Sequence, residues 1–164
     1  MIKKASLTIA LLILSAVSLY AAEFRGRVTW IYDGDTIEVE NIGKVRLLGI
    51  DTPEYQDSPR DKFYRKNFAL APEKLREIAQ QAKNFSIREV KDRRVRMETD
   101  QQPYDKHKRL LAYVYLPGGD MLNRLLLEQG LAAVFRRYDF RYKKDFLKTE
   151  KLARKRGRGL WKKD

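Results

Sequence analysis

The sequence predicts an α+β fold in which short β-strands predominate, and three observations lead to this prediction. Alternating apolar and polar residues recur in five short stretches, bounded by Gly, Pro, Asn or Asp turns. Apolar residues at helical spacing occur only after the third of these stretches. The 164 residues are enough for one ordinary domain and leave no room for two large ones.

The first three strands are expected between Phe24 and Ile50, as an antiparallel meander. Alternation up to Tyr32 ends at the tight dipeptide Asp33-Gly34, which is typical of a hairpin turn. A second strand follows over 36–40. After a turn through Gly43, a third and almost wholly apolar strand covers 45–50.

The rest of the chain alternates helices and strands. Residues 55–67 are polar and charged and are expected to form a long loop. Pro72 occupies a favoured first-turn position of a helix. The later elements are expected to be strands at 94–99 and 109–116, a helix through Leu122 that stops at Gly130, a short apolar segment at 131–135, and a helix at about 138–156. This order suits a small five-stranded Greek-key barrel of the oligonucleotide-binding type with about three packed helices, although other α+β arrangements fit it too.

Residues 1–22 have the pattern of a secretory signal peptide. Lys3 and Lys4 precede an uncharged apolar run that ends in Ala21 and Ala22. An uncleaved anchor is the alternative, but the run is shorter than the ~20 residues of a comfortable membrane span. We expect residues 23–164 to be a single domain with a basic C-terminal helix. This domain would be secreted or periplasmic in a bacterium, or membrane-attached if the N-terminal segment is retained.

The composition excludes several kinds of site. There is no cysteine, so a disulfide scaffold, a zinc finger, an iron–sulfur cluster and a thiol nucleophile are ruled out. The single histidine, His107, rules out a multi-histidine metal site. Any metal binding or catalysis must therefore depend on oxygen ligands, carboxylates and arginines.

The chain is strongly basic, with a formal net charge of +13. Residues 60–96 contain twelve basic and five acidic residues, and residues 136–158 contain eleven and three. Aromatic residues are interleaved with these charges, as expected of a surface that binds nucleic acid through phosphates and stacked bases. Solvated basic helix faces over an aromatic core are the alternative. No base-reading motif is present, so sequence specificity is not expected.

The acidic residues, although outnumbered by basic ones, point to a candidate cation-binding site. The first turn and the end of the third strand of a meander can meet at one edge of the sheet, which would bring Asp35 close to Asp51. Two carboxylates, a backbone carbonyl and waters form a site for a hard cation such as Ca²⁺ or Mg²⁺. Ordinary turn chemistry is the alternative, since Asp-Gly and Asp-Thr-Pro are common at turns and strand ends.

Two arginines accompany these carboxylates. Arg46 and Arg109 belong to apolar strand-like stretches, where an unpaired charge is costly to bury. Each could instead lie at the surface with its stem on the core. Together with Glu54 as a spare carboxylate, they match what phosphodiester cleavage needs. Arginines and a cation stabilise charge on the phosphate, and a carboxylate activates water.

Several runs of the sequence resemble those of a known family. The runs DGDT (33–36), RLLGIDTPE (46–54) and DKHKRLLAYVYL (105–116), with QGLA (129–132) and RGLW (158–161), resemble the thermonuclease, or staphylococcal-nuclease-like, family. The resemblance covers residues 24–161, essentially the whole mature chain. It implies an oligonucleotide-binding barrel with helices, and Ca²⁺-dependent hydrolysis of DNA and RNA to products ending in 3′-phosphate.

The resemblance also implies residue roles. Asp35 and Asp51 match the calcium carboxylates, and Thr52 matches the residue that ligates through its carbonyl. Glu54 matches the carboxylate assigned to the attacking water. Arg46 and Arg109 match the two phosphate-binding arginines. Ca²⁺ is the expected cofactor, ahead of Mg²⁺.

One segment departs from the family pattern. The family usually has Tyr-Gly before its second arginine, where this chain has His107 and Lys108. Together with Lys106 and Tyr138, these residues are candidate nucleic-acid contacts. The alternatives are an exposed turn for His107 and core packing for Tyr138.

The expected partners are DNA and RNA, preferably single-stranded. We expect a monomer, and no protein partner is evident in the sequence. A non-catalytic nucleic-acid-binding module of the cell envelope is the main alternative function. A domain that binds an acidic surface, such as anionic lipid or cell-wall polymer, is a third.

Overall fold

The computed structural model describes residues 22–162. The signal peptide or anchor expected over residues 1–22 therefore lies, except for Ala22, outside the described residues. Within residues 22–162, none of the helices combines the length and the apolar character that crossing a membrane requires.

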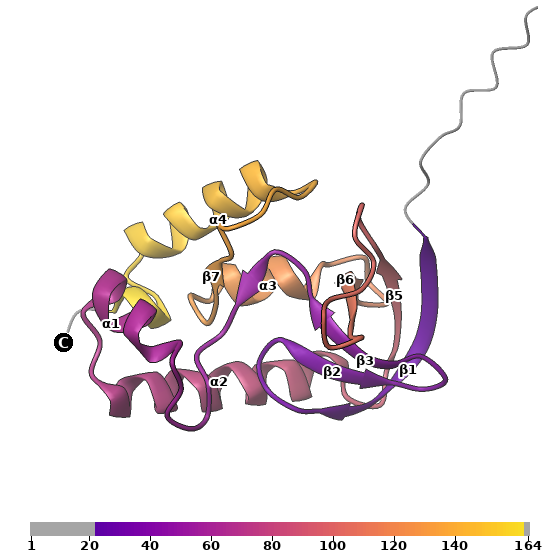
Figure 1. The fold of residues 1–164 in the computed structure, drawn as a ribbon, viewed down its shortest axis with the longest axis horizontal. Coiled ribbons are helices and arrows are strands. Elements are labelled where there is room, and N and C mark those ends of the chain that lie inside the picture. The colour runs from indigo at the N-terminus through magenta and orange to yellow at the C-terminus, as the bar shows by residue number, and fades with distance from the viewer. Residues whose placement is uncertain (1–21, 163–164) are drawn as a thin grey trace, which may run out of the picture.

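The predicted fold class is confirmed: five strands form a closed barrel, and helices pack on one side of it (Figure 1). Around the barrel the order is β1-β2-β3-β6-β5, and β4 and β7 form a separate two-stranded sheet. The strands are β1 (Glu23–Ile31), β2 (Thr36–Val39), β3 (Gly43–Leu47), β4 (Ile50–Asp51), β5 (Arg94–Glu98), β6 (Leu110–Tyr115) and β7 (Ala133–Val134). The helices are α1 (Asp61–Phe68), α2 (Pro72–Val90), α3 (Leu122–Glu128) and α4 (Lys143–Lys155), with a short 3₁₀ turn η1 (Gly159–Trp161).

The expected meander is present. β1 pairs antiparallel with β2, and β2 pairs antiparallel with β3, with Thr36 opposite Arg46. β6 closes the barrel by lying parallel to β3 and antiparallel to β5. Val28, Val45 and Met97 are fully buried, so the barrel interior forms part of the main apolar core.

The helices cover the remaining core. α2 runs from beside α1 to the barrel (Figure 1) and buries an apolar stripe that includes Leu75 and Ile78. α3 ends as predicted at Gly130, whose positive φ of 70° suits a left-handed cap. The backbone N–H of Gly130 and of the next residue donate to the carbonyls of Leu127 and Leu126.

The prediction of a long loop over residues 55–67 is wrong for the second half of this segment, because α1 begins at Asp61. No side chain caps the N-terminus of this helix. The helix is instead held by aromatic packing: Tyr64 is fully buried, and Phe68 makes an edge contact with Trp161, 5.6 Å between ring centroids. Local pattern did not reveal the helix because its stabilising partners, Asp51 and Trp161, lie outside this segment of the sequence.

Two other boundaries differ from expectation. The third strand stops at Leu47, and β4 turns away to pair with β7. The last helix begins at Lys143 and not at about residue 138. The preceding segment is bound to the barrel, since the backbone N–H of Arg141 donates to Asp100 (2.8 Å). The Arg141 side chain also donates to Glu98 and to the Thr99 carbonyl, so this segment follows the end of β5 before the helix begins.

Candidate functional site

The two aspartates that the meander was expected to bring together do meet at one edge of the barrel. Asp35 follows the β1–β2 turn, and Asp51 ends β4. Arg46 lies between them: one guanidinium nitrogen donates to Asp35, and the other donates to Asp51 Oδ1 at 2.9 Å. The pairing of Thr36 with Arg46 across β2 and β3 explains this placement, because it sets the arginine beside the turn.

Asp35 is completely buried. Its Oδ2 accepts the backbone N–H of Thr52 (2.8 Å), and its Oδ1 accepts from Arg46 and from the Thr36 hydroxyl. Burial raises the pKa of Asp35 well above its usual value, although the charge of Arg46 opposes the change. Burial therefore disfavours the ionised form of Asp35, and additional positive charge beside it would stabilise that form.

Asp51 has two partners that sequence reasoning missed. Its Oδ2 accepts from Arg60 Nε (2.8 Å) and from the Tyr64 hydroxyl (2.8 Å), which also donates to the Asp51 carbonyl (2.9 Å). Arg60 directly precedes α1, and its guanidinium lies 4.2 Å from the centroid of the Phe63 ring. Both partners come from the segment expected to be a loop, so only recognition of α1 could have pointed to them.

The β1–β2 turn is pressed tightly against α2. The Ser86 hydroxyl donates to the Gly34 carbonyl (3.0 Å). A Cβ at Gly34 would lie 2.6 Å from the Ala82 Cβ and 2.8 Å from the Thr52 Cγ2, which is too close for any side chain. Glycine is thus required at this position by a close approach that also sets the turn beside Thr52.

Glu54 and Arg109 reach the same region from two loops. Burial raises the pKa of Glu54, as do the charges of Asp33 and Asp51, while Arg46 and Arg109 oppose the change. Arg109 donates through Nε to Asp105 (2.7 Å). Its two terminal guanidinium nitrogens make no hydrogen bond within residues 22–162, so they remain for a ligand.

A cleft of about 1020 Å³ opens beside these groups, and Glu54 forms part of its wall. One side is the loop 55–60, which α2 anchors: Arg76 donates to the carbonyls of Glu54 and Gln56 and pairs with Asp61. Sequence reasoning also missed Arg76, because a contact across twenty residues leaves no local signal. The other walls include residues from the β1–β2 turn, the β5–β6 loop and the segment after β7.

The candidate nucleic-acid contacts divide into two groups. Lys106 and His107 are exposed and line the cleft. Lys108 does not line it and has a φ of 61°, a left-handed conformation that favours the glycine of the family pattern. Tyr138 is 61% exposed and lies beside Phe135 (5.7 Å between ring centroids), and its neighbour Arg137, not Tyr138 itself, lines the cleft.

The donor set fits a hard divalent cation. Four carboxylates, those of Asp33, Asp35, Asp51 and Glu54, gather around Arg46, whose pKa their charges raise although burial by itself would lower it. Arg60 and Arg109 are the other two cations, and Arg109 is paired with a fifth carboxylate, that of Asp105, so the site keeps a surplus of two negative charges in a basic protein. Asp35 Oδ2 and Asp51 Oδ1 each accept one hydrogen bond within the described residues, so each keeps a lone pair for an ion.

The ion would need further ligands. Within residues 22–162, no three carboxylate or histidine side chains converge closely enough to hold a metal by themselves. Two carboxylates would therefore be completed by a backbone carbonyl, with Thr52 adjacent to Asp51 in the chain, and by waters.

Comparisons with known proteins agree with this geometry. Residues 44–163 match the family model described as "Staphylococcal nuclease homologue". A thermonuclease of Staphylococcus hyicus is 34% identical over 139 residues, covering 82% of this chain and 74% of the relative. A thermonuclease of Staphylococcus intermedius is 35% identical over 135 residues (80% and 72%), and an uncharacterized endonuclease of Escherichia coli is 30% identical over 143 residues (85% and 78%). The family model covers most of the chain, and these relatives are at least 30% identical over 80% or more of it, so this protein belongs to the staphylococcal nuclease family.

Proposed function

We propose that this protein is an exported, metal-dependent nuclease that hydrolyses phosphodiester bonds of both DNA and RNA, and leaves products that end in 3′-phosphate. The observation that carries the proposal is a group of four carboxylates and three arginines in a strongly basic protein, of which Asp33, Glu54 and Arg60 line a cleft. Membership of a family that contains thermonucleases supports the same chemistry. The N-terminal pattern of residues 1–22 supports export.

Glu54 acts as the general base in this proposal. Its carboxyl lines the cleft, and its raised pKa makes it a better proton acceptor than an ordinary glutamate. It takes a proton from a water molecule as that water attacks the phosphorus. The bond between phosphorus and the 5′ oxygen then breaks, and the 5′ oxygen takes a proton from solvent and leaves as a hydroxyl group, so that the phosphate stays on the 3′ end.

Arg46 and Arg109 stabilise the charge that develops on the phosphate. Arg46 uses two of its five N–H groups on aspartates and keeps three, and Arg109 is oriented by Asp105. Charge-assisted donors held in place before the reaction are the most effective stabilisers of such charge.

Asp35, Asp51 and the Thr52 carbonyl would hold Ca²⁺, with Mg²⁺ as the less favoured ion. A bound cation supplies positive charge to the phosphate at the point of attack. Arg60 and Tyr64 orient the Asp51 carboxylate for this role.

The substrate is held by charge and not by base identity. Lys106, His107 and Arg137 line the cleft and present donors to the sugar–phosphate backbone. We therefore propose that DNA and RNA both bind, preferably as unpaired strands, to a monomeric enzyme.

The first experiment incubates the purified protein with end-labelled single-stranded DNA and RNA in Ca²⁺, in Mg²⁺ or in chelator. The matched control is Glu54→Gln, which keeps the size of the side chain and removes the base. We expect cleavage of both polymers in Ca²⁺, none in chelator, and products whose electrophoretic mobility changes when a phosphatase removes the 3′ end group. Salt-sensitive binding without cleavage in any metal would overturn the proposal and leave a nucleic-acid-binding module.

A further inference from the structure

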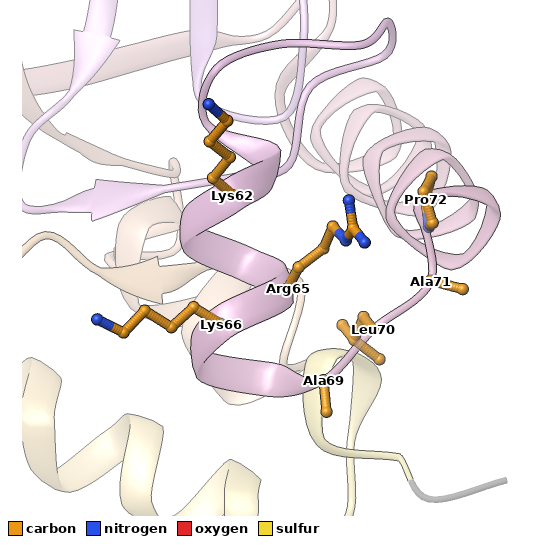
Figure 2. A pocket seen from close by; sticks show the side chains of 7 residues that line it. All are labelled: Lys62, Arg65, Lys66, Ala69, Leu70, Ala71 and Pro72. Carbon is orange, nitrogen blue, oxygen red and sulfur yellow. The ribbon is translucent and has the colours of Figure 1, made fainter.

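A second hollow, lined by basic residues, lies beside α1, the helix that Arg60 directly precedes. It has a volume of about 680 Å³ and lies between α1 and the start of α2. Figure 2 shows Arg65 extending from α1 across the space in front of Ala71 and Pro72, while Lys62 and Lys66 project from successive turns of the same helix. The residues that line this α1 groove are Lys62, Arg65, Lys66, Ala69, Leu70, Ala71 and Pro72, and none of them is acidic.

The charge of the groove is not compensated. In the described part of the chain, the one ion pair made by a residue within α1 joins Asp61 to Arg76. Lys62, Arg65 and Lys66 are exposed, and at spacings of three and four residues they repel one another.

Helix electrostatics does not account for all three cations. Arg65 and Lys66 lie in the last turn of α1, where the helix dipole favours positive charge. Lys62 lies in the first turn, where the dipole disfavours it. This short helix therefore carries a cation at the expense of its own stability, as expected if the cation contacts an external anion.

The α1 groove and the cleft are lined by neighbouring parts of the chain. Arg60 lines the cleft and Lys62 lines the groove, with one residue between them. Arg60 and Tyr64 are both hydrogen-bonded to Asp51, which fixes α1 relative to the proposed centre of hydrolysis. Lys62 and Lys66 are offset by about 6 Å along the helix axis. Lys62 and Lys66 are four residues apart and so lie on one face of α1, whereas Arg65 points toward Pro72 (Figure 2). A strand that leaves the cleft past Arg60 and follows α1 would meet cations on both sides of the helix.

We propose that the α1 groove is a second phosphate-binding site, which holds the part of an unpaired DNA or RNA strand that extends beyond the cleft. Lys62, Arg65 and Lys66 contact successive phosphates, and Leu70 and Pro72 offer an apolar surface to the sugars. The identity of the ligand rests on the proposed nuclease function. Binding at the groove does not require Glu54 or a metal.

The test compares the affinity for oligothymidylates of 2, 4 and 12 nucleotides, measured by fluorescence anisotropy in chelator so that nothing is cleaved. The variant is Lys62→Gln/Arg65→Gln/Lys66→Gln, since glutamine is a good helix former. The matched control, Lys144→Gln/Lys151→Gln/Lys155→Gln, removes the same charge from exposed positions of α4.

The groove variant is expected to bind the 12-mer about tenfold more weakly than the unmodified protein. The slope of log affinity against log salt concentration should fall in magnitude by about 2, as expected for the loss of three contacts to a single strand. Affinity for the dinucleotide, which fits within the cleft, should stay within about twofold, and the control should lose no more than about threefold affinity for the 12-mer.

Three outcomes would overturn this proposal. The first is an equal loss of 12-mer affinity in both triple variants, and the second is an equal loss of affinity for the dinucleotide and for the 12-mer in the groove variant. The third is a groove variant that keeps its affinity for the 12-mer but no longer binds anionic phospholipid vesicles. If the triple variant does not fold, the single variants Lys62→Gln and Arg65→Gln give the same comparison, each with a two- to threefold loss for the 12-mer alone.

Cleavage assays separate the groove from the proposed function. In Ca²⁺, the groove variant should raise KM for the 12-mer about tenfold and leave kcat unchanged. The unmodified protein could cleave nothing and still bind the 12-mer more tightly than the groove variant does. The nuclease proposal would then fail, and the proposal of a phosphate-binding groove would be supported.

Discussion

Two buried carboxylates in this molecule, those of Asp35 and Glu150, have similar partners but different surroundings. Each accepts a backbone N–H, from Thr52 and from Val134 respectively, and each pairs with an arginine. Glu150 is matched by Arg136, and the pair joins α4 to β7. Asp35 must instead share Arg46 with Asp51.

The difference lies in charge balance. The Glu150 pair is neutral and serves packing, because its charges satisfy each other. The Asp35 cluster retains negative charge, which a stable fold does not need and a cation-binding site does. A buried ion pair thus indicates function when its charges fail to cancel.

The largest expected effect contrasts two Glu→Gln substitutions. Glu54→Gln should lower kcat by a factor of about 10² to 10⁴, because it removes the proposed base. In chelator it should not lower the melting temperature, since it relieves repulsion among four carboxylates. Glu150→Gln should leave kcat within about twofold and lower the free energy of unfolding by about 1–3 kcal/mol. Steady-state kinetics and thermal melts measure both, and a similar loss of activity in the two variants would refute the contrast.

The next effect contrasts two arginines. Arg109→Gln should lower kcat/KM by a factor of about 10² to 10³, because it removes the two terminal guanidinium nitrogens that we propose bind the phosphate. Arg136→Gln should change kcat/KM by less than about twofold, and should lower the melting temperature because Glu150 loses its partner. A preserved rate in Arg109→Gln would exclude this residue from phosphate stabilisation.

Added Ca²⁺ should sharpen the same distinction. At a concentration one hundred times its dissociation constant, it should raise the free energy of unfolding by about 2.7 kcal/mol. Asp51→Asn should abolish this gain, whereas Glu150→Gln should keep it although its starting stability is lower. Melts in Ca²⁺ and in chelator give the difference directly, and a full gain in Asp51→Asn would remove Asp51 from the proposed site.

A matched pair of Tyr→Phe substitutions tests the residues behind the site. Tyr64→Phe removes a hydroxyl that donates to Asp51, and should weaken Ca²⁺ binding by about 10- to 100-fold with the ring packing retained. Tyr113→Phe removes a hydroxyl that donates to Asp100 (2.7 Å), and should lower stability by about 1 kcal/mol without changing Ca²⁺ affinity. Calorimetric titration measures the affinities. Equal Ca²⁺ affinities in the two variants would mean that Tyr64 only packs.

The smallest effect concerns the β5–β6 loop. Lys108→Gly should raise the free energy of unfolding by about 1 kcal/mol, because Lys108 adopts a left-handed conformation that glycine adopts without strain. Denaturant unfolding measures the change, and a destabilised variant would show that the lysine side chain makes a compensating contact.

The barrel was predictable because each of its strands has a local pattern. The alternation around Val28 and Val45 and the turn at Asp33-Gly34 are visible in short windows, and they determine the meander. The nearness of Asp35 to Asp51 was expected from that meander, but in the structure Asp51 belongs to β4, which pairs with β7, and Arg46 of β3 joins the two aspartates. The helix α1 was not predictable in this way, since Tyr64 and Phe68 take their partners from Asp51 and Trp161.

The sequence by itself determined the family resemblance, the kinds of chemistry that the missing cysteines exclude, and the carboxylates and arginines from which a site could be built. Only the tertiary structure decided which charges cancel and which remain. It placed Arg46 between two aspartates, brought Arg60 and Tyr64 to Asp51, and gave the cations of the α1 groove no ion-pair partner among residues 22–162. Electrostatic balance depends on distances between residues far apart in the chain, and these distances exist only after the chain has folded.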